Sequence, residues 1–265
     1  MEKKNLPIGV FDSGIGGLTV LYRLVEMMPN ENYVFVGDTL NLPYGTKSKE
    51  TLKGLVSDVS GYLAKVPVKA IVIACNTATA NSHHLKDEID IPVVGVIEPT
   101  ALAALKISEN ILVLATNVTI DSGEYQYYIS KNKKDPNSKQ FFCKASDFVT
   151  AIEANDINTP HSFELVRNTL KPYLNEKIDV IVMGCTHFGL YSKEIAACFP
   201  NAKQLECAYP TGEELKRILK EKDLLTDRNE KGKIKISVTK HQDNFYEKTK
   251  WFDYPYEGCN EIKIK

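Results

Sequence analysis

The alternation of short apolar runs with amphipathic ones is the feature that most restricts how this chain can fold. Seven runs of mostly aliphatic residues are too apolar for a sheet with one wet face, so we interpret them as strands buried on both sides. They are LPIGVFD from Leu6, NYVFVGD from Asn32, KAIVIAC from Lys69, IPVVGVI from Ile91, NILVLAT from Asn110, DVIVMGC from Asp179 and KIKISVT from Lys233.

The segments between these runs carry apolar residues at helical spacing. The clearest are GGLTVLYRLVEMMP from Gly16, KETLKGLVSDVSGYLAKV from Lys49, FELVRNTLKPYL from Phe163 and GEELKRILKEKDLL from Gly212. Strands that alternate with helices in this way predict an α/β fold, with mainly parallel sheets covered by helices. The lysine-rich stretch SKNKKDPNSKQ from Ser130 is interpreted as a solvated loop.

Length and charge narrow the functional class. The 265 residues, 43% of them hydrophobic, are enough for one or two domains with a real core. The net charge of −1 leaves no broad basic surface, so nucleic acid is not the expected partner. No apolar run is long enough for a signal peptide or a membrane span, and we expect a cytoplasmic protein without membrane contact.

Two of the six cysteines stand at the carboxyl ends of predicted strands, where ligands gather in α/β proteins. Cys75 is followed by Asn76 and Thr77, and Cys185 is followed by Thr186 and His187. Packing is the ordinary role of a single buried cysteine, but the repeated context makes both of these candidates for chemistry. The others are assigned to packing as reduced thiols, because no CxxC pair predicts a metal or redox site. They are Cys143, Cys198, Cys207 and Cys259.

Four segments together resemble the glutamate racemases of the aspartate/glutamate racemase superfamily. They are GVFDSGIGGLTV from Gly9, GDTLNLPYGTKS from Gly37, VIACNTATA from Val72 and GCTHF from Gly184. The resemblance implies two similar α/β domains, 1–97 plus 209–265 and 98–208, with the active site in the cleft between them. It also implies that each domain contributes one cysteine and that neither a cofactor nor a metal is used.

The proton transfers that a racemase needs are consistent with two cysteines in the active site. Inverting an α-carbon requires a base on one face and an acid on the other, and a thiolate with a thiol supplies both. The resemblance places Asp12 beside Cys75, and Glu153 and His187 beside Cys185. It gives nine substrate-binding positions: Asp12, Ser13, Pro43, Tyr44, Gly45, Asn76, Thr77, Thr186 and His187.

Other interpretations of these residues stay open at this stage. Asp12 can be a turn residue, His187 a structural histidine and Glu153 an exposed helix residue. The glycines after Asp12 do not have the GxGxxG spacing of a dinucleotide loop.

The function expected from the resemblance is the interconversion of L-glutamate and D-glutamate, which supplies D-glutamate for peptidoglycan and so for the cell wall and cell shape. An aspartate or other amino-acid racemase of the same superfamily is the first alternative, and a non-catalytic binding protein with this fold is the second. A homodimer is expected from the resemblance, whereas nothing in the sequence supports a contact with gyrase.

Overall fold

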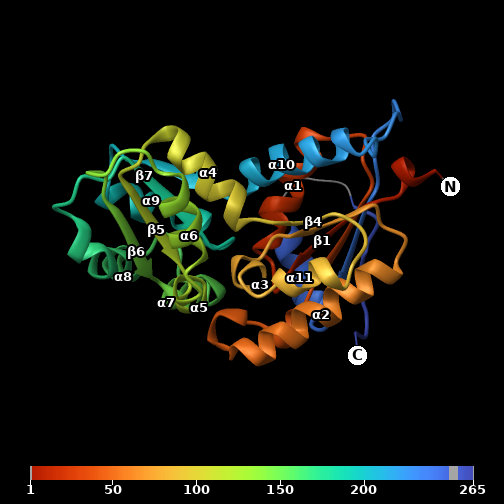
Figure 1. Cartoon of the computed structure of the whole chain (residues 1–265). Helices are drawn as coiled ribbons and strands as arrows, with labels where there is room; N and C mark the ends of the chain where they lie inside the picture. Colours follow the sequence, from red (N-terminus) through yellow and green to blue (C-terminus); the bar gives the residue numbers. More distant parts are fainter. Residues whose placement is uncertain (1, 251–255, 265) are drawn as a thin grey trace. The chain divides into compact units, whose positions relative to one another are not determined.

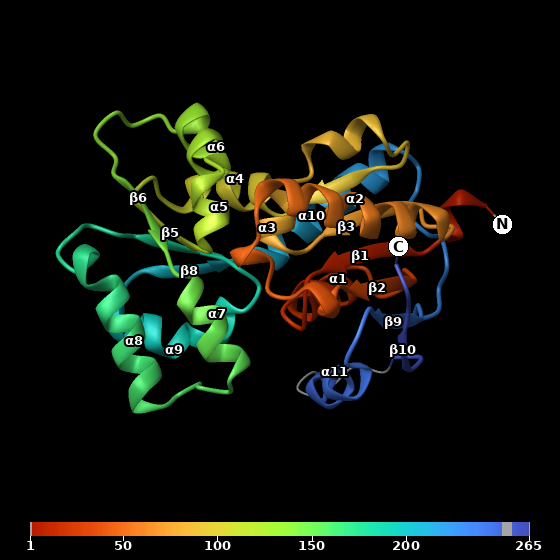
Figure 2. The ribbon, with the colours of Figure 1, turned by 90° about the horizontal axis from the view of Figure 1, so that it is seen from below.

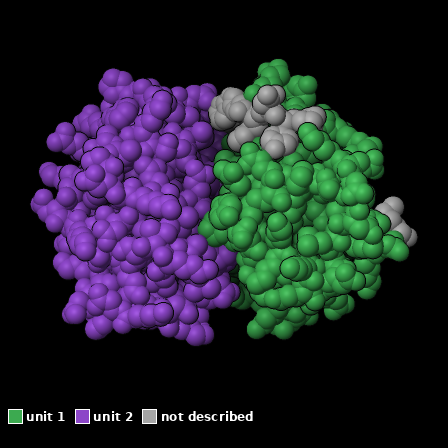
Figure 3. Space-filling model, turned by 90° about the horizontal axis from the view of Figure 1, so that it is seen from above, with its two compact units in different colours: residues 1–96, 208–265 green, residues 97–207 purple. Residues whose placement is uncertain are grey.

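The computed structural model describes residues 2–250 and 256–264, and the chain divides into two compact units. Unit 1 joins the first and last parts of the chain, residues 1–96 and 208–265, and unit 2 is Ile97–Cys207 (Figure 3). These boundaries lie one residue from those expected. Unit 1 is thus built from two segments that are far apart in the sequence.

Unit 1 contains a sheet of parallel strands. Within the described residues the order is β10 (Cys259–Glu261), β9 (Ile234–Val238), β2 (Tyr33–Gly37), β1 (Ile8–Asp12), β3 (Ala70–Ile73) and β4 (Val93–Gly95). Every neighbouring pair in this order is parallel. Because all the strands run the same way, their carboxyl ends lie along one edge of the sheet.

Helices cover both faces of this sheet (Figure 1). On one face α1 (Gly17–Met27) contacts α10 (Ala208–Glu221), and Leu21 and Leu215 join a buried cluster with Val10. On the other face α2 (Lys49–Lys65) packs on β1 and β3, with Leu63 against Gly9. Successive strand residues point to opposite faces, so β1 supplies side chains to both layers.

Unit 2 repeats this architecture on a smaller scale. Its parallel sheet has the order β6 (Gln140–Lys144), β5 (Ile111–Ala115), β7 (Val180–Gly184) and β8 (Lys203–Glu206). Helices α4 (Ile97–Ile107) and α6 (Glu124–Asn132) contact each other on one face, and α8 (Pro160–Leu170) contacts α9 (Ser192–Cys198) on the other (Figure 2). Two short helices complete the unit: α5 (Asn117–Asp121) lies between α4 and α6 in the chain, and α7 (Ser146–Glu153) lies between α6 and α8.

The predicted fold class and all seven predicted strands are confirmed. The three strands that the sequence did not predict are β6, β8 and β10, and each is an edge strand. An edge strand is solvated along one side, so it does not need the continuous apolar run that marks a central strand. The predicted loop from Ser130 is also too long, since α6 extends to Asn132 and β6 begins at Gln140.

In each unit the strand order reverses beside one central strand. The chain passes from β1 to β2 on one side, and β3 then pairs with β1 on the other; β5, β6 and β7 repeat this pattern. Such a reversal opens a crevice at the carboxyl ends of the two strands, which is where α/β proteins bind ligands. The residues after β1 and β3, and after β5 and β7, are therefore the first places to look for a site.

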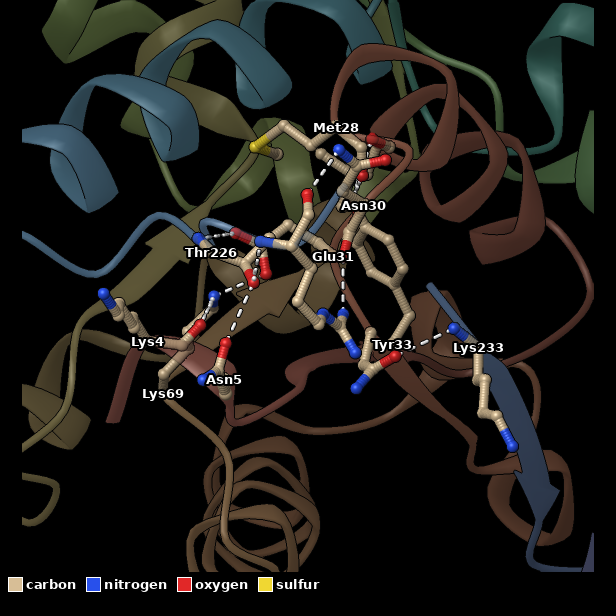
Figure 4. Close-up of polar contacts among 12 residues, drawn as sticks. Lys4, Asn5, Met28, Asn30, Glu31, Tyr33, Lys69, Thr226 and Lys233 are labelled. Atoms are coloured by element: carbon tan, nitrogen blue, oxygen red, sulfur yellow. Dashed lines mark hydrogen bonds and ion pairs between the residues drawn. The ribbon is translucent and has the colours of Figure 1, made fainter. Parts of the chain in front are cut away.

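Within unit 1, a buried polar cluster connects the C-terminal segment to residues 1–96 (Figure 4). Lys69 forms an ion pair with Glu31 in which both side chains are almost inaccessible to solvent. The other carboxylate oxygen of Glu31 accepts a hydrogen bond from the backbone N–H of Thr226 at 2.9 Å. The Thr226 hydroxyl in turn donates to Asn5 at 3.1 Å. Four separate parts of the chain, at Asn5, Glu31, Lys69 and Thr226, meet at this cluster.

Across residues 2–250 and 256–264, none of the helices combines the length and the apolar character needed to cross a membrane.

Candidate active site

The crevice between β1 and β3 brings Asp12, Ser13 and Cys75 together in unit 1. Asp12 is the last residue of β1 and is completely buried. The Ser13 hydroxyl lies 3.7 Å from the sulfur of Cys75 and 3.5 Å from a carboxylate oxygen of Asp12. The same oxygen accepts a hydrogen bond from the backbone N–H of Gly14 at 2.8 Å. Carboxylate, hydroxyl and thiol thus form one buried polar group.

The glycines after Asp12 have a packing role here. A Cβ at Gly17 would lie 2.2 Å from the Cβ of Asp12, closer than two carbons can approach. Only glycine lets α1 begin directly behind the Asp12 side chain. Gly17 therefore leaves the room that the Asp12 side chain occupies.

Cys75 comes two residues after β3 and caps α3 (Asn76–Thr79). Its sulfur accepts a hydrogen bond from the backbone N–H of Ala78 at 3.4 Å. A donor aimed at sulfur favours the thiolate, the reactive form of cysteine. Asn76 and Thr77 are buried beside it, in the first turn of the helix.

The expected binding segment at Pro43, Tyr44 and Gly45 also belongs to unit 1. Tyr44 begins the 3-10 helix η3 (Tyr44–Thr46), which contacts α3. Its ring is buried and meets the ring of Phe11 edge-on, with centroids 6.2 Å apart. Pro43 is exposed and Gly45 partly buried. The segment thus presents one buried aromatic side chain beside the Cys75 helix.

In unit 2, Cys185 follows β7 directly and starts a chain of polar contacts. Its sulfur lies 3.8 Å from Nδ1 of His187, and Nε2 of His187 lies 2.7 Å from a carboxylate oxygen of Glu153. Glu153 is the last residue of α7, 34 positions away in the sequence. Thr186 lies between the cysteine and the histidine and is half buried. The structure therefore connects Glu153 to Cys185 through His187.

His187 is buried, yet it favours the charged form. Burial by itself lowers the pKa of His187, but the hydrogen bonds to Cys185 and Glu153 and their negative charges outweigh it and raise the pKa to about 10. A doubly protonated imidazole can donate from both nitrogens, to the Glu153 carboxylate through Nε2 and to the Cys185 sulfur through Nδ1.

The remaining cysteines lie in environments that suit packing. Burial raises the pKa of Cys143 and of Cys259 to about 11 in each case. Burial also raises the pKa of Cys198, and Cys207 donates to the carbonyl oxygen of Met183 at 3.2 Å. A thiol of raised pKa is protonated at neutral pH and is a poor base.

One buried residue at the same sheet edge was missed by the sequence analysis. Asp38 follows β2, and its carboxylate accepts a hydrogen bond from the Tyr44 hydroxyl at 2.6 Å. The signal that pointed to it was its place after a predicted strand, in VGDT from Val36. The part of the chain that the structure describes contains no cluster of three or more His, Cys, Asp or Glu side chains able to hold a metal ion.

These two cysteine groups, each at the reversal point of a parallel sheet, define an α/β enzyme of two similar units. The sequence pattern of the Asp/Glu/hydantoin racemase family matches residues 8–206, and the chain belongs to that family. The predicted enzyme class, an isomerase, is confirmed by this membership.

Several proteins that are similar to this chain along most of its length are named glutamate racemase. A glutamate racemase of Clostridium acetobutylicum is 37% identical over 89% of this chain and 93% of its own length. The crystal structure of a glutamate racemase from Bacillus anthracis superposes with a TM-score of 0.92 at 31% identity, covering 99% of this chain and 100% of that one. A glutamate racemase from Francisella tularensis in complex with D-glutamate gives 0.89 at 32% identity, with 98% of each chain covered. The resemblance inferred from the four sequence segments is confirmed.

Proposed function

We propose that this protein is a glutamate racemase that interconverts L-glutamate and D-glutamate with two thiols. The observation that carries the proposal is the pair of strand-end cysteines, one in each unit, each held in its own polar group. The similarity to glutamate racemases along almost the whole chain supports the choice of substrate.

The stereochemistry of the reaction explains why two cysteines are needed. A base removes the α-proton from one face of the substrate, and an acid delivers another proton to the opposite face. A thiolate can do the first and a thiol the second, and they exchange roles in the reverse reaction. The proposal therefore requires both sulfurs to reach the same α-carbon.

In this mechanism Asp12 and His187 assist different cysteines. The Ser13 hydroxyl and the Ala78 N–H lie within reach of the Cys75 sulfur, and the Asp12 carboxylate is linked to it through Ser13. In unit 2 the His187 imidazole lies between the Cys185 sulfur and the Glu153 carboxylate, so Glu153 orients the ring toward the sulfur. The two arrangements differ, so the two sulfurs have different polar neighbours.

Glutamate is favoured over aspartate as the substrate. The relative that was crystallised with D-glutamate shares 32% of its residues with this chain, over 98% of both. An aspartate racemase from Picrophilus torridus is only 19% identical and shows likeness of fold alone. We propose that the substrate is bound by the carried-over positions, with donors from Ser13, Asn76, Thr77 and Thr186.

The proposal is tested by circular dichroism of the purified protein with L-glutamate and no added cofactor. The signal of the L-isomer should decay toward zero as the racemic mixture forms, and D-glutamate should give the mirror-image curve. A parallel run with L-aspartate decides the substrate. Decay with aspartate but not with glutamate would replace the proposed substrate, and no decay with either would remove the proposed function.

The cellular setting follows from this activity. We propose that the enzyme supplies D-glutamate for peptidoglycan in the cytoplasm, where its six cysteines remain thiols as the structure has them. A homodimer is proposed from the family resemblance alone, and light scattering of the purified protein across a concentration series tests it.

A further inference from the structure

The Tyr44 segment is held at its base by one buried carboxylate. The carboxylate of Asp38 accepts the Tyr44 hydroxyl at 2.6 Å through one oxygen, and Asn41 donates to both of its oxygens at 3.1 and 3.0 Å. The backbone N–H of Asp38 donates to the carbonyl oxygen of Asp12 at 2.9 Å. A short hydrogen bond between a hydroxyl and a carboxylate is strong and directional. Asp38 therefore fixes where the Tyr44 ring points, from a backbone tied to the Asp12 strand.

The second oxygen of Asp38 is bonded to the C-terminal segment. The hydroxyl of Thr239, just beyond β9, donates to it at 2.8 Å and accepts the backbone N–H of Leu40 at 2.9 Å. Next to this contact, the backbone N–H of Lys240 donates to the Thr39 hydroxyl at 3.0 Å, and that hydroxyl donates to the carbonyl oxygen of Lys240. The two partners of each contact are about 200 positions apart.

We propose that Asp38 and Thr239 are positioning residues, through which the C-terminal segment holds the Tyr44 hydroxyl in place for substrate binding. This inference rests on the proposed function, in which Tyr44 contacts the substrate. It gives the strand β9, which lies outside the family pattern matched at residues 8–206, a role in substrate binding.

The electrostatics of Tyr44 agree with this role. Burial raises the pKa of Tyr44 well above its ordinary value, and the negative charge of Asp38 raises it further. Charges on Cys75 and Asp12 act in the same direction, so the hydroxyl lies within electrostatic reach of both. The phenol therefore stays protonated and remains a donor to Asp38 throughout the working pH range.

The test compares two threonines of the C-terminal segment. Thr239→Val removes the hydroxyl that bonds Asp38, whereas Thr226→Val removes a hydroxyl of the polar cluster around Glu31 (Figure 4). We expect Thr239→Val to raise the KM for glutamate about 3- to 10-fold with a smaller change in kcat, the loss expected for one net hydrogen bond. Thr226→Val should leave KM unchanged, and Thr239→Ser should restore it to within about twofold. Equal KM values for the two valine variants would overturn the proposal.

The effect must also pass through the Tyr44 hydroxyl. In a Tyr44→Phe background the Thr239→Val substitution should change KM by less than about twofold, since the group that Asp38 orients is already gone. A full effect of Thr239→Val in that background would contradict the proposed role of Asp38.

A second measurement does not depend on activity. The backbone N–H of Lys47 donates to the carbonyl oxygen of Tyr44 at 3.1 Å and closes η3. Hydrogen exchange followed by mass spectrometry should show faster exchange at 44–47 in Thr239→Val but not in Thr226→Val. Unchanged exchange there would refute the positioning role even if glutamate is not the substrate, whereas faster exchange in an inactive wild type would leave it standing and remove only the proposed function.

Discussion

At the scale of single residues, Cys75 and Cys185 should be indispensable. Cys75→Ala or Cys185→Ala should abolish racemisation, because each removes the only proton carrier proposed for one face of the substrate. The loss of volume is small, so circular dichroism in the far ultraviolet should remain that of the wild type. The double variant should be hardly worse than either single one, since the two thiols act as a unit.

Two other cysteines serve as matched controls for this prediction. Cys143→Ala and Cys198→Ala remove thiols whose pKa burial raises, and both variants should racemise glutamate at a rate close to that of the wild type. Activity that survives in Cys185→Ala would mean that the second proton carrier lies elsewhere.

The buried histidine predicts a dependence of stability on pH. The folded-state pKa of His187 is raised to about 10, above its ordinary value of 6.5. Its stabilising contribution is therefore complete below about 6.5, decreases as the pH rises further, and is lost above about 10. The difference in unfolding free energy between the wild type and His187→Asn should shrink across this window.

Urea unfolding at several pH values measures that difference. His161→Asn is the control. The His161 side chain is exposed and pairs with Asp156, so its loss should change the free energy of unfolding little. A difference for His187→Asn that stays constant from pH 6 to pH 10.5 would show that the histidine is neutral in the folded protein.

At the scale of elements, the ion pair between Lys69 and Glu31 joins the starts of β3 and β2 to the C-terminal segment. Removing one partner leaves a buried charge without its counter-ion, and Lys69→Met should reduce the free energy of unfolding by about 3–5 kcal/mol. Burial lowers the pKa of Lys69, so the folded wild type already bears the free-energy cost of excluding solvent from this charge.

Lys139→Met is the matched control for this ion pair. Lys139 pairs with Glu176 at 2.9 Å, but its side chain is 62% exposed, and such pairs contribute little. Urea unfolding of both variants should show the larger loss for Lys69→Met. Comparable losses would mean that neighbouring polar groups compensate the unpaired Glu31.

At the scale of the whole molecule, the two-thiol mechanism makes a prediction about isotopes. In that proposed mechanism each unit supplies one sulfur, and the proton that one sulfur removes is not the proton that the other delivers. In heavy water the first D-glutamate formed from L-glutamate should carry deuterium at the α-carbon, while the recovered L-glutamate should carry very little. Mass spectrometry at low conversion measures both.

A single base that reaches both faces would behave differently in this experiment. It would return part of the original hydrogen to the product. Substantial early D-glutamate with protium at the α-carbon would therefore rule out one sulfur per face, even in an active racemase.

Much of the fold could be predicted because its signals are local. The central strands of both sheets, such as β1 and β7, are buried on two sides and so are apolar along their whole length. The edge strand β8 has the sequence KQLE and is indistinguishable from a loop until its partner β7 is known. Edge strands depend on pairing, and pairing is not a local property.

The sequence by itself determined the α/β class, the two cysteines at strand ends and the racemase family. Burial, periodicity and motif spacing can all be recognised from residues that are close together in the sequence. Only the tertiary structure decided how the C-terminal segment bonds to the rest of unit 1. Glu31 reaches Thr226 across 195 positions, and Asp38 reaches Thr239 across 201, since β9 pairs with β2. Hydrogen bonds act over about 3 Å, so partners of this kind are selected by the order of strands in the sheet and not by their separation along the chain.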